Sequence, residues 1–161
     1  MDISAVPTHL AWEFTHLLPG TFRRNKVEFA HHEYPILGPL PAQGPQTRPL
    51  ESSPLEGPFL YFVVDDRGAV CYVGKSQEQT VLKRWIRTGT GGPARHYWTH
   101  STKSGGAVFR IAEGLRQGRR FQLRYTALDE LRRAGWVAAG VPLDAAERQA
   151  IATLHPRWNK I

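Results

Sequence analysis

The chain of 161 residues contains a single cysteine, Cys71, and no long apolar run. One cysteine excludes an intrachain disulfide and any zinc site that uses several cysteines. A membrane-spanning helix needs about 20 apolar residues in succession, and the N-terminus has no basic segment followed by an apolar one. We therefore expect no membrane partner and no secretory leader, and these absences together favour a protein of the cytoplasm.

Aromatic residues are scarce between Pro35 and Pro58, a stretch that contains seven prolines. Such a composition does not form a packed core and is typical of an extended linker or a wrapping arm. Apolar side chains that recur at helical spacing predict a helix over residues 8–18. The chain therefore divides into residues 1–57, an N-terminal helix with a proline-rich arm, and residues 58–161, a folded domain.

Acidic residues are few in the second part of the chain. Residues 57–161 carry seventeen Lys/Arg against eight Asp/Glu, a net charge of +9, whereas residues 1–56 carry four against six, a net charge of −2. A basic part joined to a slightly acidic one indicates a polyanionic partner. A solvated basic surface kept for solubility explains the same charge equally well.

Two β-rich apolar runs, residues 59–64 and 69–76, flank an Asp/Gly cluster and predict an antiparallel hairpin. With a four-residue loop, Tyr61 lies directly opposite Tyr72 on the same face, with Cβ atoms about 5 Å apart. Lys75 then stands where the next helix is expected to open. The simpler interpretation is that both tyrosines are ordinary strand residues of a small core.

A helix is predicted over residues 76–87, followed by a glycine-rich basic loop over residues 89–106. Arg84 falls at the margin of the helix's apolar stripe, where it either covers apolar surface or aims its guanidinium at a phosphate. In the loop, aromatic residues interleaved with cations suit stacking and phosphate contacts with nucleic acid. The candidates for such contacts are Arg87, Arg95, His96, Tyr97, His100 and Lys103.

Glu147 is the most informative residue of the C-terminal region. The pattern there predicts a helix over 107–117, a half-buried strand with a basic outer face over 119–126, a short helix over 129–135 and a last helix over 144–154. Glu147 stands three residues after Asp144, the expected cap, as a capping-box glutamate does. It also shares the apolar face of its helix, where a carboxylate needs a cation partner, either a divalent metal or an arginine.

Taken in order, Tyr61, the run Tyr72-Val73-Gly74, Lys75, Arg84, Glu147 and Asn159 resemble the signature of the GIY-YIG nucleases. Tyr61 and Tyr72 are eleven residues apart and Glu147 is twelve residues before Asn159, spacings similar to those of the nuclease domains of excision-repair proteins. The resemblance covers roughly residues 58–161. It implies an α/β fold of the α+β type, a small three-stranded antiparallel sheet flanked by helices, with residues 1–57 as an N-terminal extension.

The resemblance implies an endonuclease that hydrolyses DNA phosphodiesters with one divalent metal, Mg²⁺ (or Mn²⁺). Glu147 would hold the ion, and Arg84 would stabilise charge on the attacked phosphate. Asn159 would position a side chain or a phosphate oxygen by hydrogen bonding. The candidates for activating the attacking water are Tyr61, Tyr72 and Lys75.

The implied partner is DNA, duplex or branched, or RNA, and a double-strand break would need a homodimer or two sequential nicks. Two departures from the family pattern are Phe59, where the first motif has glycine, and Thr88, where members often carry a tyrosine or a histidine. The second departure keeps open a binding module that has lost cleavage. A third interpretation is a basic interaction protein whose tyrosines and glutamate serve only the core and a helix cap.

Overall fold

The computed structural model describes residues 3–23, 33–39, 57–77, 85–88, 94–96 and 102–159, with the backbone alone at 21–23, 33–34, 86–88, 94–96 and 102–106. In chain order the elements are the 3₁₀ helix η1 (Ile3–Ala5), β1 (His9–Phe14), β2 (His16–Arg23), β3 (Glu33–Gly38), β4 (Phe59–Asp65), β5 (Val70–Ser76), β6 (Ile86–Thr88), β7 (Ala94–His96), α3 (Thr102–Arg116), β8 (Phe121–Ala127), α4 (Leu128–Arg133) and α5 (Leu143–Leu154).

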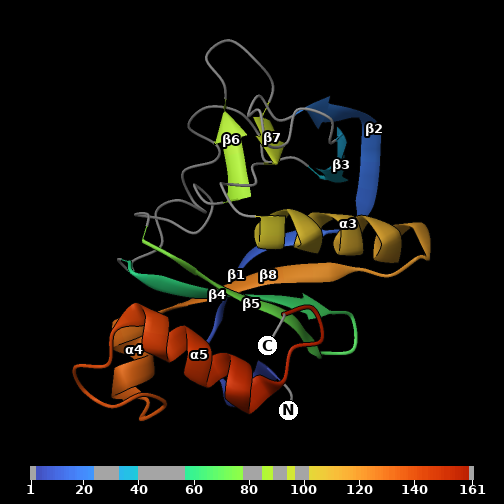
Figure 1. Cartoon of the computed structure of the whole chain (residues 1–161). Helices are drawn as coiled ribbons and strands as arrows, with labels where there is room; N and C mark the ends of the chain where they lie inside the picture. The colour runs from blue at the N-terminus through green and yellow to red at the C-terminus, as the bar shows by residue number, and fades with distance from the viewer. Residues whose placement is uncertain are drawn as a thin grey trace.

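Four strands form a central antiparallel sheet in the order β1-β8-β4-β5. Helix α3 covers one face of this sheet, and α4 and α5 cover the other (Figure 1). Alternate residues of β4 enter two buried clusters, Tyr61 and Val63 on the α3 side and Leu60 and Phe62 on the side of α4 and α5. All seven residues of β4 are buried because the strand is central and both of its faces are covered.

The mixed class of the fold, with an antiparallel sheet and flanking helices, is confirmed, but the N-terminal helix predicted over residues 8–18 is wrong. Residues 9–14 form β1, which pairs with β8 and adds a fourth strand to the sheet. The pairing buries Ala11 and Phe14 and leaves Leu10 44% exposed. Pairing with β8 and burial of Ala11 and Phe14 in the core therefore override the helix propensity of this segment.

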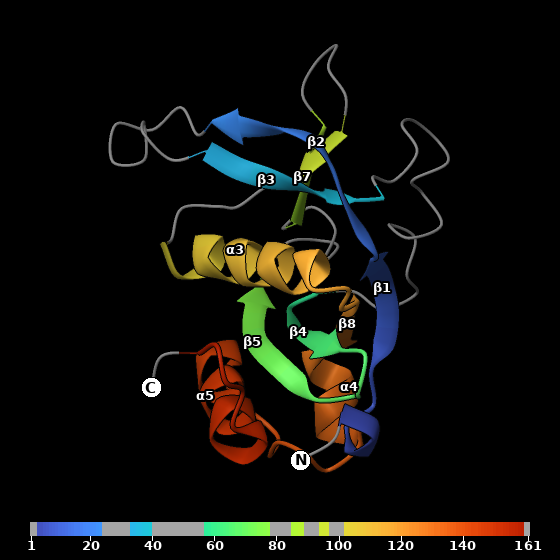
Figure 2. The ribbon, with the colours of Figure 1, turned by 90° about the vertical axis from the view of Figure 1, so that its right-hand side faces the viewer.

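Strands β2 and β3 form a separate antiparallel pair. Figure 2 shows this pair on the side of α3 that faces away from the central sheet. Strand β2 continues through Pro19 and Gly20, beyond the end of the predicted helix, with an irregularity where Gly20 has φ +95°. Part of the proline-rich arm is also strand, because β3 contains Pro35, and residues 40–56 lie outside the described residues.

The helix predicted over residues 76–87 differs from the structure at its two ends, although Trp85, which lies within it, is helical. Ser76 is a buried residue of β5 and so does not cap a helix, and Ile86–Thr88 is the strand β6. Residues 78–84 lie outside the described part of the chain. The predicted loop over 89–106 contains the strand β7, paired with β6, and the beginning of α3.

The C-terminal predictions are confirmed within a few residues. Helix α3 begins at Thr102 rather than at residue 107, and β8 and α4 lie where the apolar pattern placed them. Helix α5 begins at Leu143, so Asp144 lies in its first turn instead of at the cap. Among the described helices, none is long and apolar enough to cross a membrane.

Candidate active site at strand β5

The predicted hairpin exists as β4 and β5, but its register differs from the predicted one by two residues. Tyr61 lies opposite Gly74, and Tyr72 lies opposite Val63. A shift of one residue would have moved one tyrosine to the other face of the sheet, whereas a shift of two keeps both on the same face. The two rings are therefore diagonal neighbours, with centroids 6.2 Å apart and planes inclined by 31°.

Two local features of the hairpin account for the shift. The Asp65 N–H donates to the Ala69 carbonyl at 2.9 Å, which closes a loop one residue shorter than expected, and Gly68 in that loop has φ +82°. Cys71 then has no partner on β4, because the register moves by one residue around it. Cys71 is thus the extra residue of a β-bulge, and the bulge places it and Tyr72 in the same buried cluster.

Tyr61 is packed against the backbone of Gly74. A Cβ atom added at residue 74 would lie 2.3 Å from Cζ of Tyr61, so no side chain fits there while the ring keeps its position. The ring also makes an edge-to-face contact with Trp85, at 5.4 Å between centroids. Tyr61 is 2% exposed and Tyr72 is 8% exposed, so the hairpin holds both phenols close to the core.

Lys75, near the end of β5, forms an ion pair with Glu147 of α5 and so connects this glutamate to the hairpin. Its ammonium lies 3.2 Å from Oε2 of Glu147 and donates a hydrogen bond to Oδ1 of Asp144, one turn earlier in α5. The predicted cation partner of Glu147 is therefore a lysine, where the sequence suggested a metal or an arginine. Asp144, predicted to cap the helix, instead bonds Lys75, and the N-cap position belongs to Pro142.

The contacts of Lys75 shift two pKa values. The hydrogen bond to Asp144, helped by Glu147, raises the pKa of Lys75, although partial burial of the ammonium opposes this. The hydrogen bond from Lys75 and its charge lower the pKa of Asp144. At neutral pH Lys75 is therefore a charged ammonium beside an ionised Asp144, and it is a poor proton acceptor.

The predicted catalytic residues approach β5 from opposite faces of the sheet. Tyr61 and Tyr72 belong to the cluster under α3, whereas Lys75 is the cross-strand partner of Leu60, which belongs to the cluster under α4 and α5. Strand β5 is at the end of the central sheet. The two groups can therefore act on one ligand only at the edge of this strand.

Asn159 fastens the C-terminal segment to that edge. Its Oδ1 accepts from the Val73 N–H and its Nδ2 donates to the Val73 carbonyl, both at 2.8 Å. The Trp158 N–H donates to the Cys71 carbonyl at 2.9 Å. These bonds satisfy outward-facing backbone groups of an end strand. The amide of Asn159 thus holds backbone, where we expected it to hold a side chain or a phosphate oxygen.

Several other predicted site residues cannot be placed. Arg84, Tyr97 and His100 lie outside the described residues. Arg87 and Arg95 are cross-strand partners on β6 and β7, His96 pairs with Ile86, and Lys103 lies in the first turn of α3, but only their backbone is described. A groove of about 700 Å³ lies beside β1 and β8, and none of the predicted catalytic residues line it.

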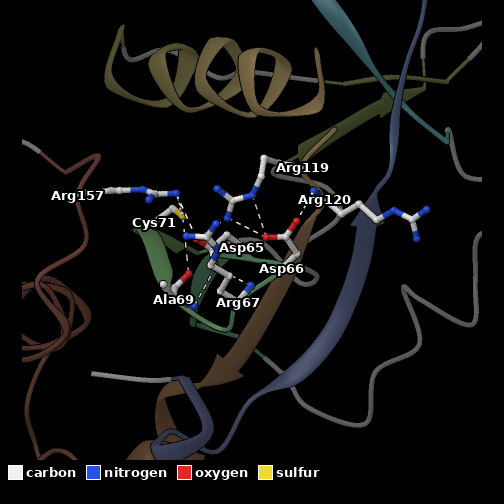
Figure 3. Close-up of polar contacts among 8 residues, drawn as sticks. All are labelled: Asp65, Asp66, Arg67, Ala69, Cys71, Arg119, Arg120 and Arg157. Atoms are coloured by element: carbon white, nitrogen blue, oxygen red, sulfur yellow. Dashed lines mark hydrogen bonds and ion pairs between the residues drawn. The ribbon is translucent and has the colours of Figure 1, made fainter. Parts of the chain in front are cut away.

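One charged network was missed entirely by the sequence analysis. The carboxylate of Asp65, only 2% exposed, accepts from the backbone N–H of Arg67 and Ala69 and from the guanidinium groups of Arg119 and Arg157. Figure 3 shows these two arginines converging on the turn between β4 and β5. An aspartate at a turn is common, and its spacing from the two arginines carries no sequence signal.

The oxygen donors of the Lys75 cluster suit a hard divalent cation. Glu147 and Asp144 direct carboxylate oxygens at one positive group, and Mg²⁺ commonly binds one or two carboxylates while keeping several waters. Within the described part of the chain, no three His, Cys, Asp or Glu side chains gather as a metal site. A metal bound there would therefore rest on these two carboxylates and would compete with the ammonium of Lys75.

Compared with models of known protein families, with curated proteins and with solved structures, the chain matches none.

Proposed function

We propose that this protein is a metal-dependent endonuclease that hydrolyses phosphodiester bonds of DNA by a GIY-YIG-type mechanism. One observation carries the proposal, the convergence of distant motif residues on a single strand. Tyr72 and Lys75 belong to β5, Tyr61 packs on it, Glu147 binds Lys75, and Asn159 bonds Val73 across 86 residues of sequence. A nuclease of this type needs its motif residues gathered at one place, and this arrangement meets that requirement.

In this proposal Lys75 acts as a fixed cation. Its raised pKa keeps the ammonium charged, so it stabilises negative charge on a phosphate instead of removing a proton from water. Proton transfer then falls to a phenol. Tyr72 is the more exposed of the two tyrosines and is the better candidate, while Tyr61, packed on Gly74 and Tyr72, is a positioning residue.

The metal of this proposal is Mg²⁺ (or Mn²⁺), held by Glu147 with Asp144 beside it. When bound, such an ion supplies positive charge next to the oxygens of the attacked phosphate. Glu147 is 21% exposed, so its carboxylate can exchange a lysine contact for a metal contact without a change in the core. Arg84 keeps its proposed role at the phosphate, although it lies outside the described residues.

A second candidate function, a nucleic-acid-binding module without cleavage, is favoured by the same cluster. Lys75 already balances the charge of Glu147, so the fold needs no metal to keep this carboxylate partly buried. Both candidates take DNA, duplex or branched, or RNA as partner, and a homodimer would serve an enzyme that cuts both strands. We also keep the cytoplasm as the proposed compartment, because the chain has one cysteine.

Supercoiled plasmid separates the two candidates. An endonuclease converts it to nicked or linear DNA in Mg²⁺ and stops when EDTA is added, and the ratio of nicked to linear product shows how many strands are cut. A binding module retards the plasmid in a gel and leaves it supercoiled. Retardation without product, also on branched and single-stranded substrates, would refute the nuclease proposal.

A further inference from the structure

A basic pocket lies apart from the Lys75 cluster, at the other end of β5. Its volume is about 280 Å³, and it opens where the C-terminal half of α3, the start of β8 and the C-terminal segment meet. Arg110, Glu113 and Gly114 come from α3, Arg119 precedes β8, and Arg157 and Trp158 follow α5. None of the predicted catalytic residues line it.

The buried carboxylate of Asp65 holds two of the pocket's arginines in fixed positions. Asp65 Oδ2 lies 3.1 Å from a terminal nitrogen of Arg119 and 3.3 Å from one of Arg157. Arg157 is anchored further by the Cys71 sulfur, 3.2 Å away, and lies over the ring of Trp158, with Cζ 5.7 Å from its centroid. Despite these contacts its side chain is 53% exposed, so part of the guanidinium faces solvent.

Three arginines line the pocket, and the carboxylates nearest to them, those of Asp65, Asp66 and Glu113, already have partners of their own. Glu113 is engaged by Arg116 and Gln117, each at 3.3 Å, and Asp66 is engaged by Arg119. Arg110 is exposed, and it makes no hydrogen bond or ion pair within the described part of the chain. Arg110 and the exposed part of Arg157 therefore have N–H groups to offer a ligand.

These features define the chemical class of the ligand. A guanidinium held in a fixed orientation matches the paired oxygens of a phosphate, and an adjoining aromatic ring suits the sugar or base attached to it. The volume is at the small end of ligand pockets, enough for one such unit. We propose that this pocket binds the phosphate ester of one nucleotide unit, between Arg110 and Arg157.

The position of the pocket connects it to the proposed function. Arg157 and Trp158 contact Cys71, four residues before Lys75 on β5, which corresponds to about 13 Å along the strand. That separation is within the reach of a few nucleotides of one strand. The inference rests on the proposed function only in naming a nucleic-acid strand as the source of the ester.

Binding measured in EDTA tests the pocket without any cleavage. The probe is a fluorescently labelled single-stranded oligonucleotide, followed by anisotropy at several salt concentrations. Arg110→Gln removes one cation from an exposed side chain and leaves the core intact. We expect affinity to fall about threefold to tenfold and the slope of log K against log salt to fall by about 1. Arg157→Lys keeps the charge but loses the forked geometry, and we expect a fall of similar size.

Arg133→Gln is the matched control, because Arg133 is an exposed residue of α4 on the opposite face of the sheet. An equal loss of affinity in Arg133→Gln and Arg110→Gln would show that only overall charge matters and would overturn the pocket. An unchanged affinity of Arg110→Gln for the oligonucleotide would also overturn the pocket as a site for a nucleic-acid strand, and the next probe then tests a free nucleotide.

A nucleoside 5′-monophosphate is the second probe and identifies the source of the ester. The readout is the indole N–H signal of Trp158 in a nitrogen-proton NMR spectrum, assigned with Trp158→Phe. A shift that Arg110→Gln abolishes, without an effect on oligonucleotide binding, assigns the pocket to a free nucleotide. No shift and no effect on the oligonucleotide refute the proposal. If the protein leaves plasmid uncut but still binds the oligonucleotide in a way that depends on Arg110, the nuclease proposal is refuted and the pocket proposal is supported.

Discussion

Replacing Gly74 by alanine tests whether the tyrosine pair depends on close packing between β4 and β5. A Cβ at this position would lie 2.3 to 2.5 Å from two ring carbons and the hydroxyl oxygen of Tyr61. The ring would have to withdraw by about 1 Å to reach ordinary contact. It has little room to do so, because it is 2% exposed and lies between Trp85 and Tyr72, with ring centroids at 5.4 and 6.2 Å.

The cost of Gly74→Ala follows from this geometry. Forcing an extra methyl group into a packed core costs about 1–3 kcal/mol, and in a chain of this size each kcal/mol lowers Tm by roughly 2–4 °C. We therefore expect Tm to fall by about 2–12 °C in differential scanning calorimetry. Urea unfolding should give the same loss with an unchanged m-value, since the folded and unfolded surfaces hardly change.

A double-mutant cycle identifies the cause of that loss. Tyr61→Leu removes the ring that a Cβ would strike, so the cost of Gly74→Ala should fall by at least half in this background. If Gly74→Ala costs the same with tyrosine and with leucine at position 61, the clash is not the reason, and the account of the hairpin is wrong. Gly74→Ala should also lower plasmid cleavage if the position of Tyr61 supports that of Tyr72.

Two further predictions concern the C-terminal segment and the Lys75 cluster. Asn159→Ala leaves the N–H and carbonyl of Val73 without their partners, and we expect a loss of about 1–3 kcal/mol in urea unfolding. Asp144→Asn tests the lowered pKa of Asp144: because the folded pKa lies below the unfolded value of about 3.9, the stability this group adds is present above pH 4 and is lost as the pH falls through the folded pKa. Wild type should therefore exceed the variant in stability at pH 6, and the difference should shrink by pH 3; a difference that persists unchanged at pH 3 would contradict the ion pair with Lys75.

Periodicity predicted the parts of the fold in which each element buries its own apolar face. In the hairpin, two apolar β-rich runs flank an Asp/Gly turn. In α3 and α5, the apolar residues lie on one face of each helix. In these elements the local sequence pattern therefore agrees with the final packing. Residues 9–14 are the opposite case. Their apolar spacing fits a helix, but the open edge of β8 pairs with them, and no local pattern reports that partner.

The sequence predicted which elements carry the candidate residues better than it predicted the contacts between those residues. Motif spacing indicated Tyr61, Tyr72 and Glu147 correctly as residues of one hairpin and one helix, but not the register that places Gly74 under a ring. The lysine bridge had a signal that could have found it: Lys75 alternates away from Tyr72 on β5, toward the face that α5 covers. The Asp65 network had none, because it joins a turn to arginines more than 50 residues away.

The central claim is that Glu147 supports cleavage through a divalent cation. The most direct measurement compares Glu147→Gln with the exposed control Glu13→Gln on supercoiled plasmid in Mg²⁺, with thermal unfolding and DNA binding recorded on the same preparations. The account predicts that Glu147→Gln folds and binds DNA but loses cleavage at least a hundredfold, roughly the size of effect seen when one group that stabilises charge is removed, while Glu13→Gln cleaves like wild type. Cleavage at the wild-type rate by Glu147→Gln, or no metal-dependent cleavage by wild type, would contradict it.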